Sequence, residues 1–343
     1  MTSVPGPSLL ERRLVIVTGK GGTGKTTVAA ALALAASQRG LRVLVAEVGR
    51  QEHLPRLLVP GCPPVGYAGR ELLPRLTAMR IEPFEALAEY LSLQLHSRRL
   101  VNLALRNRGF RQMMEAAPGW RELITLGKVW LLEQARTESA SEHGARQQRP
   151  AEQEPLYDLL VVDAPATGHG MTFLDVPRVV VSALHTGPLR RHAELVADMI
   201  RDNRHTVLLP VALAEELPAR ETVELVERAR REVGISVDRI VVNEVARAPF
   251  PTELDDLDRY LAALPENTPL GGLPSLSSLA ACATYASTRY ALNHSYLEQI
   301  SQRTALPVIP LPYLSKGVAG PEALLELAEA LLEPPQRPTR CPH

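Results

Sequence analysis

The stretch that decides the fold is RLVIVTGKGGTGKTTVAAALALAASQRG, residues 13–40. It opens with a short apolar run, residues 13–17, that is rich in β-branched side chains, and it continues through a glycine-rich turn. An alanine-rich segment, residues 27–38, then favours a helix that stops at Gly40. The predicted order of elements is therefore strand, loop, helix.

The loop between this strand and helix matches the phosphate-binding pattern G-x-x-x-x-G-K-[ST] at residues 19–26. Glycines let backbone N–H groups curl around phosphates, the Lys25 amine can reach the β- and γ-oxygens, and the Thr26 hydroxyl can ligate magnesium. The alternative is a glycine-rich turn that binds nothing, but the flanking strand and helix are the context that the pattern requires. The sequence thus predicts ATP and Mg²⁺ as cofactors. The nucleotide-binding candidates of this segment are Gly19, Gly21, Gly22, Thr23, Gly24, Lys25, Thr26 and Thr27.

The rest of the chain alternates buried strands with helices. The further strand candidates are residues 42–48, 157–162, 206–212, 239–243 and 306–311. Helical stretches separate them, which predicts an α/β fold with a doubly wound, mostly parallel sheet covered on both faces. No internal repeat is present, so we expect a single P-loop NTPase domain over residues 1–343 with one nucleotide site per chain.

Three segments depart from this alternation. Between residues 83 and 136, apolar side chains recur three and four residues apart, which predicts a helical insertion within the domain. Residues 137–155 contain no aliphatic side chain larger than alanine and are predicted to be a flexible linker, and the proline-rich tail, residues 334–343, to be disordered. The insertion could form an apolar groove for a client helix. Its methionines are only Met113 and Met114, which favours an amphipathic cover on the sheet or a dimer contact instead.

Composition and charge exclude several classes of protein. With 38 basic and 38 acidic residues the formal net charge is +0, so we expect no nucleic-acid partner. The start of the chain lacks the layout of a signal peptide, and no apolar run approaches the ~20 residues that span a bilayer, so we expect a cytoplasmic protein. Cys62, Cys282 and Cys341 are too few and too scattered for a disulfide framework or a cysteine-rich metal site.

Asp163 ends the apolar strand YDLLVV. A carboxylate at the carboxyl end of a strand beside the P-loop is where a magnesium-bound water would be oriented. The alternative is an aspartate that caps the following turn. We therefore predict Thr26 and Asp163 as the residues that hold Mg²⁺.

The sequence GKGGTGKT, with Lys20 directly before Gly-Gly, resembles the deviant Walker A motif of a dimeric family. That family contains the arsenite-pump ATPase (ArsA), targeting factors for tail-anchored proteins, and the MinD/ParA proteins. The resemblance implies that Lys20 is the signature lysine, which crosses to the partner's nucleotide. It thereby implies a nucleotide-switched homodimer, or a heterodimer with a paralogue. The alternative is a solvated lysine in the loop.

Later segments are similar to the arsenite-pump and targeting branch of that family. The run DAPATGHGMTFLDVP, residues 163–177, resembles its switch II. Thr167, Gly168 and His169 match the motif, whereas Ala166 stands where proline is usual.

The nucleotide base also has candidate partners in this resemblance. Asn243, in VVNEV, resembles the asparagine that reads adenine, and PLPYLSKGVAGPEAL resembles the loop that holds the base around Pro310 and Pro312. The resemblance covers residue 13 to about 332, in order.

The first switch departs from the family, which carries an aspartate just after the second strand to orient the attacking water. In RVLVAEVGRQEHL that position falls at Gly49. Glu47 and Glu52 are the candidate replacements, and hydrolysis is then expected to be slow or to need a partner that completes the site. The alternative for Glu47 is a structural acid paired to a neighbouring cation.

The zinc site of the eukaryotic targeting factors is also missing. Their C-x-x-C pair would fall at Ala283 and Ala286, and Cys282 stands alone beside it, whereas a zinc shared by two chains needs two thiolates from each. We predict no zinc. The clustered cysteines and fused P-loop halves of arsenite-activated pumps are absent as well.

These observations predict an ATPase that resembles the anion-transporting type and acts on a protein partner, including a membrane-protein or membrane-complex client. The catalytic candidates are Lys20, Lys25, Asp163 and Glu47. One alternative is an ATP-stabilised binding subunit of a heteromer with very slow or no turnover. The other is a targeting chaperone for membrane proteins.

Overall fold

The computed structural model describes residues 8–49, 51–95, 98–116, 119–137, 154–166, 170–248, 263–265, 276–318 and 320–332. Most of the expected linker and the whole of the expected tail lie outside these residues. The two ends of the linker segment are paired with each other, because the Thr137 amide donates to the Glu154 carbonyl at 2.9 Å and Arg136 bridges to Pro155.

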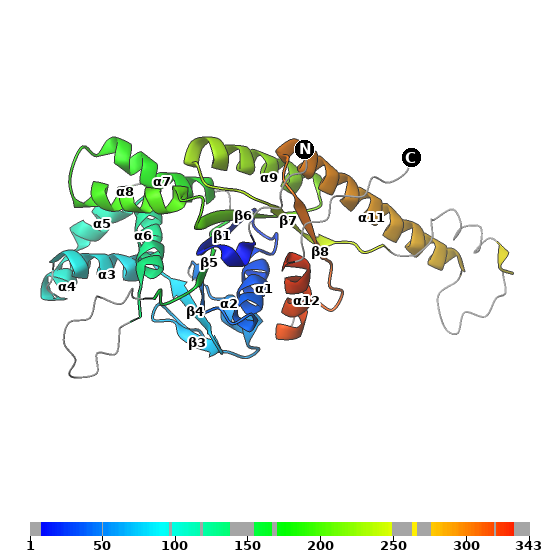
Figure 1. Cartoon of the computed structure of the whole chain (residues 1–343), viewed down its shortest axis with the longest axis horizontal. Helices are drawn as coiled ribbons and strands as arrows, with labels where there is room; N and C mark the ends of the chain where they lie inside the picture. Colours follow the sequence, from blue (N-terminus) through cyan, green and yellow to red (C-terminus); the bar gives the residue numbers. More distant parts are fainter. Residues whose placement is uncertain are drawn as a thin grey trace.

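The core is an eight-stranded sheet in the order β3-β4-β2-β5-β1-β6-β7-β8 (Figure 1). The strands are β1 (Leu14–Thr18), β2 (Val43–Val48), β3 (Arg70–Leu73), β4 (Leu76–Ile81), β5 (Leu159–Asp163), β6 (Thr206–Leu213), β7 (Ile240–Val245) and β8 (Val308–Pro312). All neighbouring strands are parallel except β3, which runs antiparallel to β4. The predicted α/β fold with a mostly parallel sheet is confirmed, and each predicted strand lies within two residues of its expected bounds.

The β3–β4 hairpin at one edge of the sheet was not predicted. Arg70 and Glu71 of β3 are exposed, and the strand has no buried residue, so its sequence lacks the apolar alternation that marks a strand. An exposed, charged edge strand of this kind also protects the sheet against pairing with another chain.

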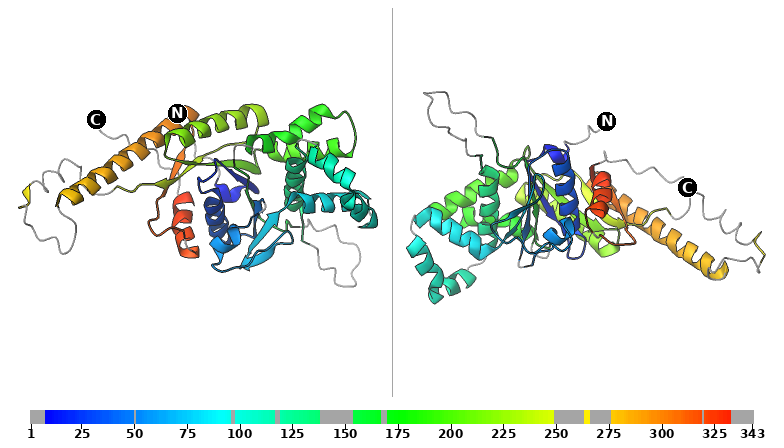
Figure 2. Two further views of the ribbon diagram at one scale, coloured as in Figure 1. Left: turned by 180° about the vertical axis from the view of Figure 1, so that it is seen from behind. Right: turned by 90° about the horizontal axis from the view of Figure 1, so that it is seen from below.

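Helices cover both faces of the sheet (Figures 1 and 2). They are η1 (Leu9–Glu11), α1 (Lys25–Gln38), α2 (Leu54–Leu58), α3 (Pro83–Leu95), α4 (Arg98–Arg106), α5 (Arg108–Ala116), α6 (Trp120–Gln134), α7 (Gly170–Ala183), α8 (Pro188–Arg201), α9 (Glu216–Arg228), the π-helical turn η2 (Ala229–Val233), α11 (Leu276–Thr304) and α12 (Pro321–Leu332). Helices α1, α2 and α12 pack on one face, and α6, α7, α8, α9 and α11 on the other. Because both faces are covered and successive strand residues point to opposite faces, the central strands are buried along most of their length and are apolar except near their ends.

The region predicted as a helical insertion folds as α3, α4, α5 and α6. It lies at one end of the molecule, beside α7 and α8 (Figure 1). Leu123 of α6 packs there with Val176 of α7 and Ala193 of α8. The insertion is thus packed against α7 and α8, the helices that follow β5.

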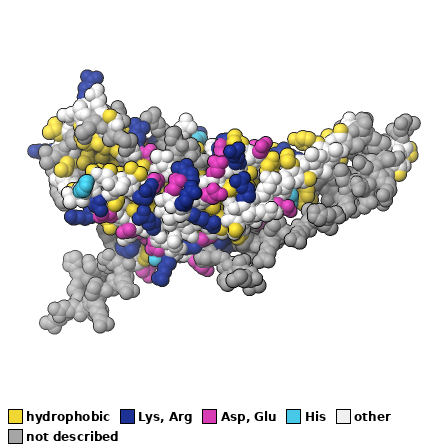
Figure 3. All heavy atoms as spheres, turned by 90° about the horizontal axis from the view of Figure 1, so that it is seen from above, with side chains coloured by type: hydrophobic (Ala, Val, Ile, Leu, Met, Phe, Trp, Pro, Cys, Tyr) yellow, Lys and Arg dark blue, Asp and Glu magenta, His cyan; other side chains and the backbone are white. Residues whose placement is uncertain are grey.

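The surface shows no single-sign patch on the face seen in Figure 3, where basic and acidic side chains are interspersed over the helices. In the part of the chain that the structure describes, none of the helices combines the length and apolar character needed to cross a bilayer.

Candidate nucleotide-binding site

Residues 19–24 form a tight loop between β1 and α1, at the carboxyl edge of the sheet. Gly19 has φ +152° and passes so close to β6 that an added Cβ would lie 2.1 Å from the Val211 carbonyl oxygen. Gly24 has φ +86°, and a Cβ there would lie 2.2 Å from the Asn243 side-chain nitrogen. Only glycine fits at these two positions, so the conformation of the loop requires the glycines of the phosphate-binding pattern.

The loop is closed on itself by the Lys20 carbonyl. This oxygen accepts hydrogen bonds from the Thr23 hydroxyl at 3.0 Å and from the Lys25 amine at 2.9 Å. Burial lowers the pKa of Lys25, and the nearby Asp163 carboxyl opposes that shift. A half-buried amine whose hydrogen-bond partner in the described residues is a loop carbonyl is well placed to exchange it for an anionic oxygen. Thr27 follows on α1 and is half-buried.

Asp163 ends β5 next to this loop, as predicted. Its Oδ2 accepts a hydrogen bond from the Thr26 hydroxyl at 2.5 Å, while its Oδ1 is buried without a partner in the described residues. Burial raises the pKa of Asp163 to about 6, against the opposing effect of the Thr26 bond. An orphaned carboxylate oxygen beside a hydroxyl is a donor set that suits Mg²⁺. The residues present therefore fit the metal that the sequence predicts.

Asn243 reaches the loop from β7. It is buried, and its amide donates to the Thr23 carbonyl at 3.1 Å. It also borders a cavity of about 380 Å³ that is lined in addition by Glu244 and by side chains of α11, among them Arg289. Glu244 has φ +58°, at a point where the pairing of β7 with β8 shifts register. The predicted base-reading asparagine thus stands between the loop and an open cavity.

Pro310 and Pro312 lie on β8, the neighbour of β7. Pro310 pairs with Val242 and Pro312 with Val245. The Tyr313 amide then donates to the Val245 carbonyl at 2.9 Å. The structure thus brings both prolines into register with the strand that carries Asn243.

Lys20, the predicted signature lysine, is not simply solvated. Its amine forms an ion pair of 2.9 Å with Glu221 of α9. The two side chains are 37% and 38% exposed. Nothing in the local sequence marks this partner, because Glu221 lies 201 residues away along the chain.

Glu47 and Glu52, the candidates for orienting water, are both engaged in structural contacts. The Glu47 Oε2 accepts the backbone amides of His53 at 2.8 Å and Leu54 at 3.0 Å, which fixes the start of α2. Burial raises the pKa of Glu47, and these two amides oppose the shift. Glu52 accepts the amides of Val65 and Gly66. Among the described residues, which do not include Arg50, the hydrogen-bond partners of Glu47 are thus backbone amides.

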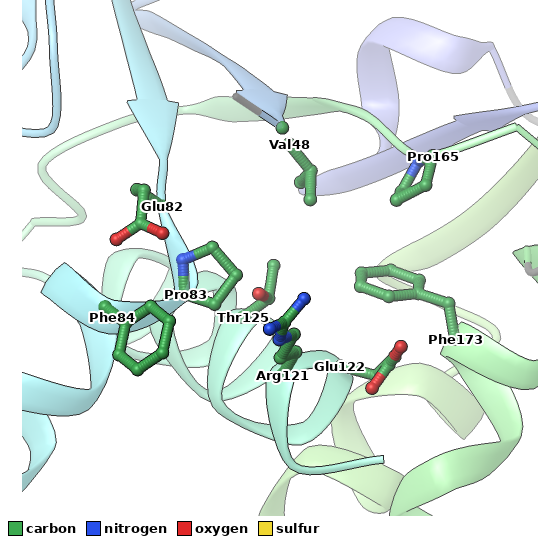
Figure 4. A pocket seen from close by; sticks show the side chains of 10 residues that line it. Val48, Glu82, Pro83, Phe84, Arg121, Glu122, Thr125, Pro165 and Phe173 are labelled. Carbon is green, nitrogen blue, oxygen red and sulfur yellow. The ribbon is translucent and has the colours of Figure 1, made fainter. Parts of the chain in front are cut away.

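A second cavity lies beyond the loop, between the switch segments and the insertion (Figure 4). Its volume is about 270 Å³. Val48 closes it from β2 and Pro165 from the end of β5, whereas Phe84, Arg121 and Thr125 enter from α3 and α6. The predicted switch II residues Thr167, Gly168 and His169 lie outside the described residues. The described part of switch II lies beside the loop, because a Cβ added to Gly21 would lie 3.8 Å from the Cβ of Ala166.

The position of the missing zinc pair lies on α11. Ala283 is buried there, and Cys282 is exposed with a free thiol. Within the described ranges, no group of three or more histidine, cysteine or acidic side chains is arranged to hold a metal ion.

The fold and the loop define a class: an α/β protein with a P-loop between its central strand and first long helix. The sequence model of the anion-transporting ATPases matches residues 12–194. The chain is also 30% identical over 355 residues to the ATPase BagA of Mycobacterium tuberculosis, covering 97% of this chain and 96% of that protein. It is 22% identical to the ATPase get3 of Neurospora crassa, covering 94% and 91%. The chain belongs to the anion-transporting ATPase family, and the predicted ArsA-like resemblance is confirmed.

Proposed function

We propose that this protein binds Mg-ATP at residues 19–26 and hydrolyses it. The observation that carries the proposal is the pairing of Thr26 with Asp163 at 2.5 Å, which leaves Asp163 Oδ1 buried and free for a cation. Membership of an ATPase family supports the nucleotide, and the glycine geometry of the loop supports the phosphate.

Each residue of the site has a role in this proposal. Lys25 leaves the Lys20 carbonyl and holds the β- and γ-phosphate oxygens, while the loop amides surround the phosphates. Thr26 and Asp163 hold the magnesium, whose charge supplies electrostatic stabilisation of the transferred phosphoryl group. Asn243, Pro310 and Pro312 face the base from β7 and β8.

The dimer is part of the same proposal. Lys20 acts across a two-fold interface on the partner's nucleotide, in a homodimer or in a heterodimer with a paralogue. For this, Lys20 must leave Glu221, and an ion pair more than a third exposed is weak enough to exchange. ATP thereby favours the closed dimer in the cytoplasm.

Steady-state phosphate release tests hydrolysis. The wild-type protein with Mg-ATP should release phosphate faster than a Lys25→Ala variant, by at least about tenfold, because the lysine stabilises charge on the transferred group. Circular dichroism of both proteins checks that the variant is folded. Equal rates for the two proteins, alone and with candidate partners, would remove the enzyme from the proposal.

A second function is favoured by a specific observation. Gly49 stands where the family has an aspartate, and both nearby carboxylates, Glu47 and Glu52, hold backbone amides. ATP that binds without turnover would make the chain an ATP-stabilised binding subunit of a heteromer. The same measurement separates the two functions, since this subunit would bind ATP yet match Lys25→Ala in phosphate release.

The insertion is the proposed site of action on a protein partner. Leu93 of α3 is 52% exposed and Leu103 of α4 is 68% exposed, so this end of the molecule offers apolar surface. The cavity in Figure 4 lies between helices α3 and α6 of the insertion and the switch segments. A membrane-protein or membrane-complex client would be delivered or regulated there. A pull-down with an ATP-trapped variant should enrich such a client, and a Leu103→Asp variant should lose it.

A further inference from the structure

In the described residues, both carboxylates near the first switch already accept backbone amides, Glu47 through Oε2 and Glu52 through both of its oxygens. Gly49, at the position of the family's aspartate, has no side chain. The segment that joins β2 to α2 nevertheless contains another polar side chain, that of His53. We propose that the His53 imidazole orients the attacking water, in place of the family's aspartate. This inference rests on the proposed ATPase function.

A continuous chain of contacts fixes His53 at the site. Thr26 bonds Asp163, and Asp163 is the register partner of Glu47 on the neighbouring parallel strand, about 4.8 Å away. Both carboxylates point to the sheet face that α1 covers, because each lies two residues after a side chain in the core of that face, Val45 or Val161. Glu47 then bonds the His53 amide at 2.8 Å.

The imidazole itself is available. His53 is the N-cap residue of α2, but its side chain makes no capping hydrogen bond, and its ring nitrogens have no hydrogen-bond partner in the described residues. The residue is exposed. Since Glu47 fixes the backbone of His53, the side chain can change without removing the start of α2.

The electrostatics agree with this placement. Burial is the main cause that raises the pKa of Asp163 and of Glu47, and His53 lies close enough to contribute to the pKa of both carboxyls. His53 is therefore near the magnesium residue as well as the switch carboxylate.

Hydrolysis requires the imidazole only to orient the water. The water oxygen forms a bond to the γ-phosphorus while the bond from that phosphorus to the β,γ-bridging oxygen breaks, and the bridging electron pair stays on ADP. A ring nitrogen of His53 accepts a hydrogen bond from the water and aligns it. The water's proton leaves with the phosphate product or enters solvent. No further reactant is needed.

The test compares His53→Ala with Gln51→Ala, a neighbouring exposed polar residue of the same loop. The first readout is equilibrium binding of Mg-ADP with and without fluoroaluminate, which mimics the transferred phosphoryl group. We expect His53→Ala to bind Mg-ADP as the wild type does but to lose about tenfold or more of the extra affinity that fluoroaluminate gives. Gln51→Ala should keep it.

Phosphate release provides the second readout. His53→Ala should lower kcat by about 10- to 100-fold with little change in KM, because the interaction exists only with the aligned water. His53→Gln, which keeps a hydrogen-bond acceptor, should restore part of the rate. The inference is overturned if His53→Ala captures fluoroaluminate and turns over like the wild type, or if Gln51→Ala shows the loss instead. A wild-type protein that matches Lys25→Ala in both readouts would mean that the proposed function has failed, and the role of His53 with it.

Discussion

Asp163 is a carboxyl group that the fold buries without a full set of partners. In the part of the chain that the structure describes, only one of its oxygens accepts a hydrogen bond, and burial raises its pKa to about 6. The folded protein therefore prefers this group protonated more strongly than the unfolded chain does, whose reference value is 3.8. A bound divalent cation would reverse that preference, because its charge favours the carboxylate.

The unliganded protein should gain stability from Asp163→Asn. Because the folded pKa is raised, the contribution of Asp163 is intact below about pH 4 and is lost as the pH rises through 6. At pH 7.5 the variant should be more stable by about 3 kcal/mol, the value that corresponds to a shift of roughly two pKa units. Urea unfolding at pH 7.5 and at pH 4 measures this, and the difference should shrink at the lower pH.

The control for this prediction is the same comparison with saturating Mg-ATP. The order should then reverse, because the wild type binds the cation more tightly than the variant and is stabilised by mass action. A variant that is less stable than the wild type without ligand, at both pH values, would show that Asp163 is not strained by burial.

Single residues divide into those that the sequence reveals and those that only the fold reveals. The P-loop residues follow from a spacing rule, because phosphate binding needs them at fixed positions along the chain. Asp163 follows from its place at the end of an apolar strand. The partner of Lys20 and the capping role of Glu47 depend on contacts between separate elements. Local sequence carries no record of such contacts, so these roles had to come from the structure.

Among the elements, α6 is the one that fixes the insertion against the rest of the domain. Gly127 lies in its middle, and a Cβ there would lie 2.1 Å from Nε2 of His192 on α8. That imidazole packs against Tyr90, at 5.0 Å between ring centroids, and against Trp130, at 6.0 Å. Burial lowers the pKa of His192, in keeping with an uncharged packing role.

Gly127→Ala should destabilise the protein although alanine is the better helix former. Alanine gains about 1 kcal/mol in helix propensity. Forcing a methyl group into the buried contact with His192 costs about 1–3 kcal/mol. If the imidazole ring cannot shift, the helix backbone has to move instead. A net loss in the free energy of unfolding is therefore expected in urea titrations.

A double-mutant cycle identifies the cause. In a His192→Ala background the added methyl group meets no ring, so Gly127→Ala should become neutral or stabilising. If Gly127→Ala costs the same in both backgrounds, the contact between α6 and α8 is not as close as described.

At the scale of elements, prediction succeeded where burial is uniform. Strands β1, β2, β5, β6 and β7 were found because their runs of buried apolar residues are typical of a sheet that is covered on both faces. The β3–β4 hairpin was missed because its edge strand is exposed and charged. Helix α1 begins at Lys25, two residues before its predicted start, since the lysine and threonine of the P-loop are already helical.

At the scale of the whole molecule, the ion pair with Glu221 holds Lys20, the predicted signature lysine, on its own chain. Glu221→Gln should release Lys20 and favour the proposed ATP-bound dimer. After solvent screening the pair is worth about 0.5 kcal/mol, which corresponds to a roughly twofold shift in the dimerisation constant. Sedimentation across a concentration series with a non-hydrolysable ATP analogue measures the shift.

The matched control is Glu224→Gln on the same helix, which removes an ion pair with Arg220 and an equal charge. It should leave dimerisation unchanged. If the two variants behave alike, general charge rather than Lys20 sets the equilibrium. If the wild type stays monomeric with saturating analogue, the proposed role of Lys20 across an interface is lost.

The architecture of the whole chain was predictable because alternating strands and helices admit few arrangements. The joining of the insertion to α7 and α8 was not, since Leu123 and Val176 are ordinary helical apolar residues whose partners depend on the tertiary fold. A partner protein likewise cannot be predicted from the motifs, because its recognition depends on the surface of the folded chain.

Calorimetric titration of ATP, with and without Mg²⁺, is the sharpest test of the proposed nucleotide site. We expect one ATP per wild-type chain, an affinity that rises with Mg²⁺, and loss of binding in Lys25→Ala. We also expect Asp163→Asn to remove the magnesium effect, because Asp163 provides a buried oxygen beside Thr26 that has no hydrogen-bond partner in the described residues. Unchanged binding in Lys25→Ala, or a magnesium effect that survives Asp163→Asn, would contradict the proposed site.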